Sequence, residues 1–253
     1  MVARMTCVEI FRRCVEAMSQ HKLIVRESAR DKEFHFQNWF ESRLVETRLR
    51  YERGGRNSYP DFRLVEHTDG YEIKGLAYPG REVTYDCNSQ APSGYHNGRT
   101  VYYAFGRYPA RPDGNRYPLL DLVICHGDFL NADHEYVHGN RSIKGFGTYG
   151  DIMIRDRKMY VAPTPFGLLN GVAHQRTLVV PESLRLDNEY VPVGDMVRTE
   201  ADRILVAYSF DLRSNELSAR WVGNPAKGRE HRFRAYRLRG DSEESVSLRS
   251  VAE

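Results

Sequence analysis

Residues 60–74 read PDFRLVEHTDGYEIK, and this stretch predicts the fold around it. Residues 62–66 and 71–77 are rich in residues that favour strands, and they flank His67-Thr68-Asp69-Gly70. An Asp-Gly pair between two such runs is typical of a hairpin turn. The stretch therefore predicts a β-hairpin, and its helical or strand-like surroundings indicate the class of fold.

Asp61, Glu72 and Lys74 lie close together if this hairpin forms. Strand alternation puts Glu72 and Lys74 on one face and points Ile73 into the core, while the hairpin brings Asp61 to the same edge. Two carboxylates and the Ile73 backbone carbonyl are hard oxygen ligands of the kind that Mg²⁺ binds. Lys74 would face the attacking water and a phosphate, so these residues predict metal-assisted displacement at phosphorus.

Two amphipathic helices are expected before the hairpin. Thr6-Cys7-Val8-Glu9 is typical of a capping box, and apolar residues follow at helical spacing, so residues 7–20 are predicted to form the first helix. The second helix is predicted from about residue 29 to residue 50, and Gly54-Gly55 is expected to end this helical region.

After the hairpin, the sequence contains a series of short segments that favour strands. Turn-rich loops separate these segments, and only the acidic, Ser-rich end is typical of a loosely ordered tail. A helical N-terminus followed by a strand-rich body predicts an α/β or α+β fold in a single domain of residues 1–253. The further strands are expected at residues 83–87, 100–105, 119–125, 151–154, 159–162, 177–180, 204–212, 217–222 and 232–238.

The composition favours a globular protein of the cytoplasm. Hydrophobic residues make up 41% of the chain, yet no run approaches the roughly 18 apolar residues that span a bilayer, so no membrane partner is expected. Four cysteines without a CxxC pair indicate neither disulfides nor structural zinc. Of the 37 basic residues 31 are Arg, which is compatible with nucleic-acid contact and equally with a GC-rich genome.

Pro60-Asp61 followed by Glu72-Ile73-Lys74 resembles the PD-(D/E)xK nuclease superfamily, best known from type II restriction endonucleases. The resemblance implies a restriction-endonuclease-like core over about residues 30–125, in which a helix precedes the catalytic hairpin and helices flank a mixed β-sheet. It also implies an acidic residue on that helix, and Phe40-Glu41-Ser42-Arg43-Leu44 looks like the FExxL element that supplies it. Residues 126–253 match no part of the pattern and are expected to serve DNA recognition or dimerisation.

The chain contains a second Pro-Asp pair and a second acid-x-Lys triplet, so the sequence around each copy must distinguish them. Pro112-Asp113 lies in a sequence typical of a turn, and Asp156-Arg157-Lys158 lies at the tip of an expected hairpin. Neither copy has the order of helix, strand, turn and strand that surrounds the first. A surface hairpin held by salt bridges remains the alternative interpretation of the first copy.

A rival motif is His134-Glu135-Tyr136-Val137-His138, the HExxH signature of zinc peptidases. The motif needs a helix, but Gly139-Asn140 follows the second His directly. Arg141 and Lys144 stand where the longer form of the signature has Gly and a third His. A solvated loop with two incidental histidines is the alternative.

Three segments carry side chains suited to DNA. The loop 88–99 offers groups that pair with base edges, the Gly-rich loop 139–150 lacks the order of a phosphate-binding loop but is basic, and the strand 232–238 alternates Arg with aromatics. An ordinary surface loop and a charged edge strand are the alternatives. The expected DNA contacts are Asn88, Ser89, Gln90, Arg99, Arg141, Lys144, Arg232 and Arg234.

The predicted function is a Mg²⁺-dependent, sequence-specific endonuclease for double-stranded DNA, a type II restriction enzyme for which Mn²⁺ substitutes. Asp61, Glu72 and the Ile73 carbonyl are the expected metal ligands, Lys74 positions the water, and Glu41 is an outer carboxylate or a ligand of a second ion. Cutting both strands at a symmetric site predicts a homodimer. A repair or structure-specific nuclease, a zinc peptidase and a non-catalytic DNA-binding protein are the alternatives.

Overall fold

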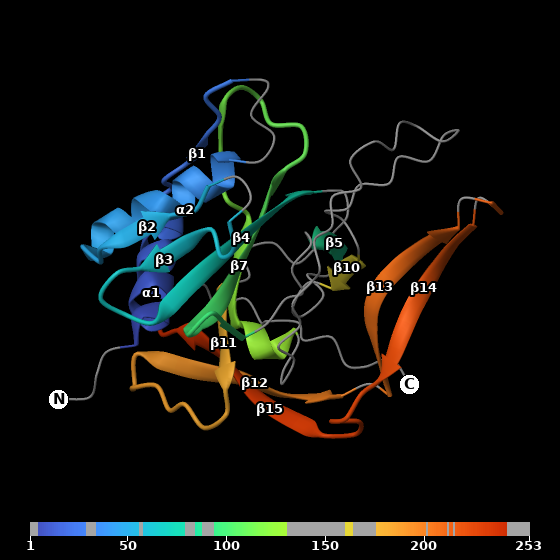
Figure 1. The fold of residues 1–253 in the computed structure, drawn as a ribbon. Helices are drawn as coiled ribbons and strands as arrows, with labels where there is room; N and C mark the ends of the chain where they lie inside the picture. The colour runs from blue at the N-terminus through green and yellow to red at the C-terminus, as the bar shows by residue number, and fades with distance from the viewer. Residues whose placement is uncertain are drawn as a thin grey trace.

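The structure, a computed structural model, is built around one large mixed sheet (Figure 1). The sheet has nine strands in the order β12-β15-β11-β9-β7-β4-β3-β2, with β6 paired to β7. The pairs β4–β7 and β9–β11 are parallel and the others are antiparallel. The predicted class, α+β with a mixed sheet, is confirmed. The structure describes residues 5–28, 34–55, 58–78, 84–87, 94–130, 160–163, 176–200, 202–211, 213–214 and 216–241.

The elements fall into the sheet, two α-helices, a short 3-10 helix and three separate strand pairs. The helices are α1 (Thr6–Ser19), α2 (Phe34–Thr47) and the 3-10 helix η1 (Gly127–Phe129). The sheet contains β2 (Tyr51–Arg53), β3 (Phe62–Leu64), β4 (Asp69–Tyr78), β6 (Tyr95–His96), β7 (Arg99–Pro109), β9 (Asp121–His126), β11 (Arg176–Pro181), β12 (Tyr190–Thr199) and β15 (Glu230–Leu238). The strand pairs are β1 (Ile24–Val25) with β8 (Arg116–Tyr117), β5 (Thr84–Cys87) with β10 (Tyr160–Pro163), and β13 (Arg203–Asp211) with β14 (Glu216–Gly223).

Most of the strands predicted from the sequence are present. Strands occupy or overlap every predicted strand segment except residues 151–154, which lie outside the described residues. The long strand β12 was missed, because Pro192 and Gly194 lower strand propensity in its first half. The structure accommodates both residues with a register shift between them, opposite β15 at the edge of the sheet.

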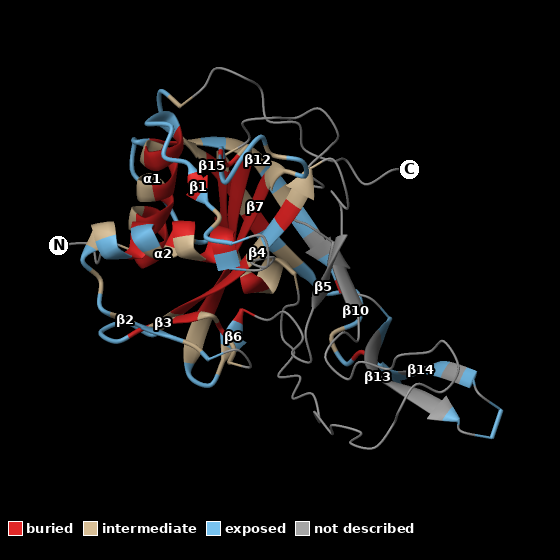
Figure 2. Ribbon diagram, turned by 90° about the horizontal axis from the view of Figure 1, so that it is seen from above, coloured by how far each residue is buried: buried red, intermediate tan, exposed pale blue. Residues whose placement is uncertain are grey.

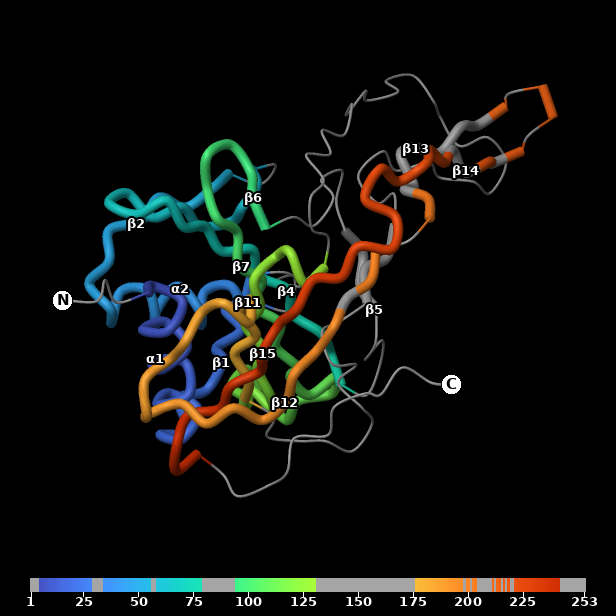
Figure 3. Tube along the Cα trace, turned by 90° about the horizontal axis from the view of Figure 1, so that it is seen from below, coloured from blue at the N-terminus to red at the C-terminus, as the bar shows by residue number. Residues whose placement is uncertain are grey.

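Both α-helices cover the same face of the sheet (Figures 1 and 2). Phe11 of α1 and Phe40 of α2 are fully buried in the same core cluster as Ile73 and Ile124 of the sheet. Burial of each such side chain contributes about 1.5–3 kcal/mol, so this face holds the helices in place. The opposite face carries a second cluster that includes Leu76 and Tyr103. Figure 3 shows β13 and β14 beyond the end of the main sheet.

The predicted capping box at the start of α1 is wrong. Met5 is the N-cap residue and makes no side-chain cap bond, while Thr6 is already helical. The Thr6 hydroxyl instead bonds the Tyr71 hydroxyl at 2.7 Å and the Asp69 carboxylate. A buried tertiary partner has replaced the local one, and it ties the start of α1 to the start of β4.

The second helix ends earlier than predicted. The helix stops at Thr47, and Arg48 has a φ of 61°, a left-handed conformation that breaks the helical repeat. The strand β2 then follows, so Gly54-Gly55 closes a strand and not the helical region. The predicted start at residue 29 lies outside the described residues.

The predicted hairpin exists, but its turn is not the Asp-Gly pair. Asp69 and Gly70 already belong to β4, where Gly70 pairs with Arg63, and residues 65–68 connect the strands. A Cβ on Gly70 would lie 2.5 Å from Cγ of Pro60. Gly70 is therefore needed for the close approach of Pro60 to β4, which brings the next residue, Asp61, to the sheet.

Candidate active site

Asp61 and Glu72 face each other across the β3–β4 hairpin. The register pairs Phe62 with Tyr71, so one further step along the strands places Asp61 opposite Glu72. Directly opposed residues of antiparallel strands share a face. The Asp61 N–H donates to Oε2 of Glu72 at 3.2 Å, and the Ile73 N–H donates to Oδ2 of Asp61 at 2.8 Å. The Glu72 carboxylate thus bonds the backbone of Asp61 and the Asp61 carboxylate bonds the backbone of Ile73, so the hairpin brings the two carboxylates to one edge.

Lys74 joins the carboxylates on this face. Its Nζ lies 2.5 Å from Oε1 of Glu72, and the two side chains are only 16% and 8% exposed. An ion pair this well shielded from solvent is stronger than one on the surface. The alternative of a solvated surface hairpin does not fit this burial.

Burial and the neighbouring Glu72 carboxylate raise the pKa of Asp61 to about 7. Burial is the largest cause and the Glu72 carboxylate is the next, since each disfavours a second negative charge at this place. The Lys74 ammonium, the N–H of Ile73 and the Arg53 guanidinium act in the opposite direction. The part of the shift that arises from Glu72 is repulsion between two carboxylates, which a bound cation would offset.

Ile73 packs into the core with its side chain and faces Asp61 with its backbone. Its side chain is 9% exposed and lies in the core on the helix side. Its N–H points to Asp61, and in a strand the N–H and C=O of one residue point to the same side. β3 pairs with β4 only at Gly70 and Tyr71. The Ile73 carbonyl is therefore directed to the edge of β4 at which Asp61 lies.

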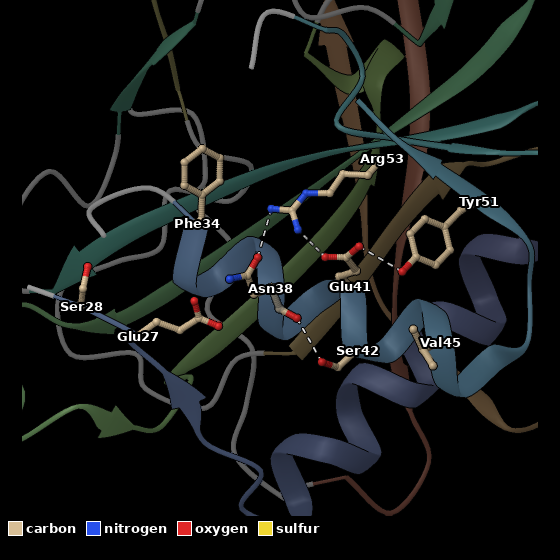
Figure 4. Close-up of a pocket in the computed structure, with 9 residues that line it drawn as sticks. All are labelled: Glu27, Ser28, Phe34, Asn38, Glu41, Ser42, Val45, Tyr51 and Arg53. Atoms are coloured by element: carbon tan, nitrogen blue, oxygen red, sulfur yellow. Dashed lines mark hydrogen bonds and ion pairs between the residues drawn. The ribbon is translucent and has the colours of Figure 1, made fainter. Parts of the chain in front are cut away.

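Glu41 lies on α2 and is held by two residues of β2. Its Oε1 accepts from the Tyr51 hydroxyl at 3.0 Å, and its Oε2 accepts from Arg53 at 2.6 Å (Figure 4). In the described part of the chain, no group of three or more His, Cys, Asp or Glu side chains could hold a metal ion. Glu41 thus does not form a three-carboxylate set with Asp61 and Glu72.

A groove of about 700 Å³ opens beside Glu41 (Figure 4). Arg53 connects this groove with the carboxylate pair, because it bonds Asn38 at 3.1 Å as well as Glu41 and also lowers the pKa of Asp61. Sequence reasoning missed Arg53, which no motif marks. The only local signal for Arg53 is that it lies two residues from Tyr51 in one strand, so that both side chains are on the same face. The groove is lined by Glu27, Ser28, Phe34, Asn38, Glu41, Ser42, Val45, Tyr51 and Arg53.

Sequence reasoning also missed an aromatic pair beside the carboxylates. The hydroxyls of Tyr59 and Tyr103 are 2.7 Å apart. Tyr103 is the register partner of Glu72 on the parallel strand β7, and Tyr59 stands two residues before Asp61. The pairing of β4 with β7 is set by the fold and leaves no signal in the sequence.

The expected DNA contacts that the structure describes each make bonds within the chain. Arg99 donates to the carbonyls of Leu64 and His67 at 2.8 and 3.2 Å, so it holds the loop between β3 and β4. Arg234, whose side chain is 16% exposed, pairs with Asp195 and Glu182. Arg232 is exposed and pairs with Glu230. The remaining expected contacts, Asn88, Ser89, Gln90, Arg141 and Lys144, lie outside the described residues.

The zinc-peptidase motif at residues 134–138 also lies outside the described residues. Among the helices of the described segments, none is both long and apolar enough to cross a membrane. No protein-family model matches the chain, and neither a curated protein nor a solved structure is similar to it.

Proposed function

We propose that the protein is a Mg²⁺-dependent nuclease that acts on double-stranded DNA in the cytoplasm. The observation that carries this proposal is the convergence of Asp61, Glu72 and Lys74 on one shielded face of the β3–β4 hairpin. The same three positions carry the sequence resemblance to the PD-(D/E)xK nucleases. A surface salt bridge requires neither this burial nor a second carboxylate opposite the first.

The donor set fits a hard divalent cation. Two carboxylates and one carbonyl direct oxygen atoms to the same edge, and Mg²⁺ keeps its remaining waters in such sites. The repulsion from Glu72, which together with burial raises the pKa of Asp61, supports the same fit, because a bound cation would offset it. When bound, Mg²⁺ supplies Lewis-acid activation of water and offsets the charge on phosphate.

Lys74 performs the remaining chemistry that the chain itself provides. Its ammonium is fixed by Glu72, so it presents a donor and a positive charge beside the carboxylates. A donor in this position orients a water molecule and stabilises charge on a phosphate oxygen. Arg53 holds Glu41, and we assign Glu41 the part of an outer carboxylate.

We further propose sequence-specific cleavage by a homodimer, as in a type II restriction enzyme. Cleavage of both strands at a symmetric site requires two catalytic centres related by a twofold axis. Mn²⁺ is expected to substitute for Mg²⁺. A repair or structure-specific nuclease would use the same three residues, so the pattern of products must separate the two roles.

The first experiment is incubation of the purified protein with phage-sized duplex DNA in Mg²⁺ or in EDTA, followed by a gel. Discrete bands with Mg²⁺ alone are expected, and a smear would retain the nuclease without the specificity. Intact DNA in Mg²⁺ and Mn²⁺, tested over several methylation states, would refute the proposal.

Two substitutions connect the cleavage to the site. Asp61→Ala and Lys74→Ala are expected to lower cleavage by at least about 100-fold, because each removes a group that acts on the reacting atoms. Asp113→Ala and Lys227→Ala are the matched controls, since both residues are exposed and lie outside the hairpin. Full activity of either site variant would show that the hairpin is not the catalytic centre.

A further inference from the structure

The bond between the Tyr59 and Tyr103 hydroxyls, here called the tyrosine pair, spans the strand that carries the candidate ligands. Tyr103 belongs to β7, on one side of β4, and Tyr59 leads into β3 on the other side. The two hydroxyls are 2.7 Å apart although 44 residues separate them in sequence. A contact between these two tyrosines therefore connects both neighbours of β4 across the face that carries Glu72.

Tyr103 is a rigid anchor for this bond. It is 2% exposed and belongs to the cluster on the face opposite the helices. Its ring stacks on Phe105 with the ring centres 6.0 Å apart. It is the register partner of Glu72 on the adjacent strand. The position of its hydroxyl relative to Glu72 is thus set by the sheet.

Tyr59 is the partner on the other side of β4, and it stands two residues before Asp61. It is half-buried, and its ring contacts His96 of β6 edge-on with the ring centres 4.9 Å apart. From Tyr59 the chain reaches Asp61 through Pro60 alone. A shift of Tyr59 therefore moves Asp61 relative to Glu72.

Besides the bond from the Ile73 N–H to its carboxylate, Asp61 has two further attachments, and both use its backbone. Its carbonyl accepts from the Gly54 N–H at 2.7 Å, and its N–H donates to Glu72. Neither can be removed by a side-chain substitution that leaves the ligands in place. The tyrosine pair differs, because Tyr→Phe deletes one oxygen atom and keeps the ring.

We propose that Tyr59 and Tyr103 are positioning residues that set the distance between the Asp61 and Glu72 carboxylates for a divalent cation. This inference rests on the proposed function, because it assigns the pair a role in the same site. Neither tyrosine is required to touch metal or DNA. Loss of either hydroxyl is expected to weaken metal binding without removing a ligand.

The test is the affinity of the full chain for Mn²⁺, measured by isothermal titration calorimetry on four forms: wild type, Tyr103→Phe, Tyr59→Phe and the double variant. Each single variant is expected to weaken Mn²⁺ binding by about threefold to tenfold, the effect of one hydrogen bond. The double variant is expected to lose less than the sum of the two single losses, because each single variant already removes the bond that the two hydroxyls share.

The matched control is Tyr102→Phe. Tyr102 is the neighbour of Tyr103 on β7 but faces the helices, where its hydroxyl interacts with the Cys7 thiol. Melting in EDTA is expected to show losses of stability in Tyr102→Phe and Tyr103→Phe alike. Only the variants of the tyrosine pair should weaken Mn²⁺ binding.

The outcomes separate this inference from the proposed function. Unchanged Mn²⁺ affinity in Tyr103→Phe, with wild-type cleavage of DNA, would overturn the positioning role and leave the nuclease intact. Weakened Mn²⁺ binding without DNA cleavage by the wild type would support the positioning role and refute the nuclease. A wild type that binds no Mn²⁺ would overturn both.

Discussion

The environment of Asp61 differs from that of an ordinary surface carboxylate. An aspartate in water is ionised at neutral pH, but the pKa of Asp61 is raised to about 7 by burial and by Glu72. About half of the metal-free molecules therefore hold a proton on Asp61 at pH 7. A cation must displace this proton, so metal binding depends on pH.

The sign of this dependence follows from the two states of the chain. Between about pH 4 and pH 7 the folded chain keeps a proton that the unfolded chain releases. The free energy of unfolding of the metal-free protein therefore falls as pH rises through this window, and the loss is complete above about pH 7. Bound Mg²⁺ offsets the charge that causes this loss.

We predict that Mg²⁺ stabilises the protein more at high pH. At saturating Mg²⁺ and pH 8, a rise in Tm of about 5–10 °C is expected. At pH 6 about nine-tenths of Asp61 is protonated, so the affinity is about tenfold lower and the rise is about half as large. Differential scanning calorimetry at the two pH values measures both quantities.

Asp61→Asn is the control for this prediction. The amide oxygen can still accept from the Ile73 N–H, while the negative charge is absent. The variant is expected to melt at a higher temperature than the metal-free wild type at pH 8 and to lose the response to Mg²⁺. A wild-type response that is equal at pH 6 and pH 8 would contradict the role of Asp61.

At the scale of elements, the β3–β4 hairpin depends on residues outside it. Its loop of residues 65–68 has no Asp-Gly turn, and Arg99 at the start of β7 holds the carbonyls of Leu64 and His67. Pro60 packs against Gly70, and the Asp61 carbonyl accepts from Gly54. The hairpin is therefore placed by tertiary contacts and not by its own turn.

Arg99→Ala tests this account against the DNA-contact role predicted from sequence. Loss of two hydrogen bonds from a guanidinium is expected to lower the free energy of unfolding by about 1–3 kcal/mol. Arg232→Ala is the comparison, because Arg232 is exposed and its ion pair with Glu230 lies on the surface. It is expected to change stability by less than about 0.5 kcal/mol while weakening DNA binding.

Chemical denaturation and a DNA-binding titration in Ca²⁺ on the same variants check both expectations. If the Arg99→Ala protein is as stable as the wild type but binds DNA less tightly, Arg99 contacts DNA and does not hold the hairpin loop. An Arg232→Ala protein with wild-type DNA affinity would remove Arg232 from it.

At the scale of the whole molecule, the two faces of the sheet have different surroundings. The helices pack against one face (Figure 2), and Tyr103, the register partner of Glu72, belongs to the cluster on the other face. The β13–β14 pair stands away from the main sheet and is joined to no other strand in the described part of the chain (Figures 1 and 3). The helix side therefore provides the packing that supports the strands, and the proposed nuclease chemistry is assigned to the opposite side.

The predicted homodimer is tested on supercoiled plasmid DNA that carries one cleavage site. Two centres acting in one complex are expected to produce linear DNA directly, and light scattering is expected to give twice the mass of the 29.3 kDa chain. Accumulation of nicked circles by a protein of monomer mass would contradict the dimer and favour a nuclease that cuts single strands.

The sequence alone predicted what depends on neighbours along the chain. Two helices, most strands and the meeting of Asp61 with Glu72 and Lys74 follow from helical and strand periodicity, since one hairpin contains all three site residues. The predictions that were wrong relied on local sequence signals, and contacts between distant residues gave those residues a different role. The Thr6 hydroxyl donates to the Asp69 carboxylate and does not cap the helix. Asp69 and Gly70 belong to the strand β4 and do not form the turn.

Only the tertiary structure decided the order of the strands and the electrostatics of the site. The pairing of β4 with β7 brought Tyr103 beside Glu72, and β2 placed Arg53 against Glu41. The raised pKa of Asp61 arises from burial, which requires the whole sheet and its cover. Strand order and burial depend on contacts between residues far apart in the chain, and periodicity describes only residues that are near one another.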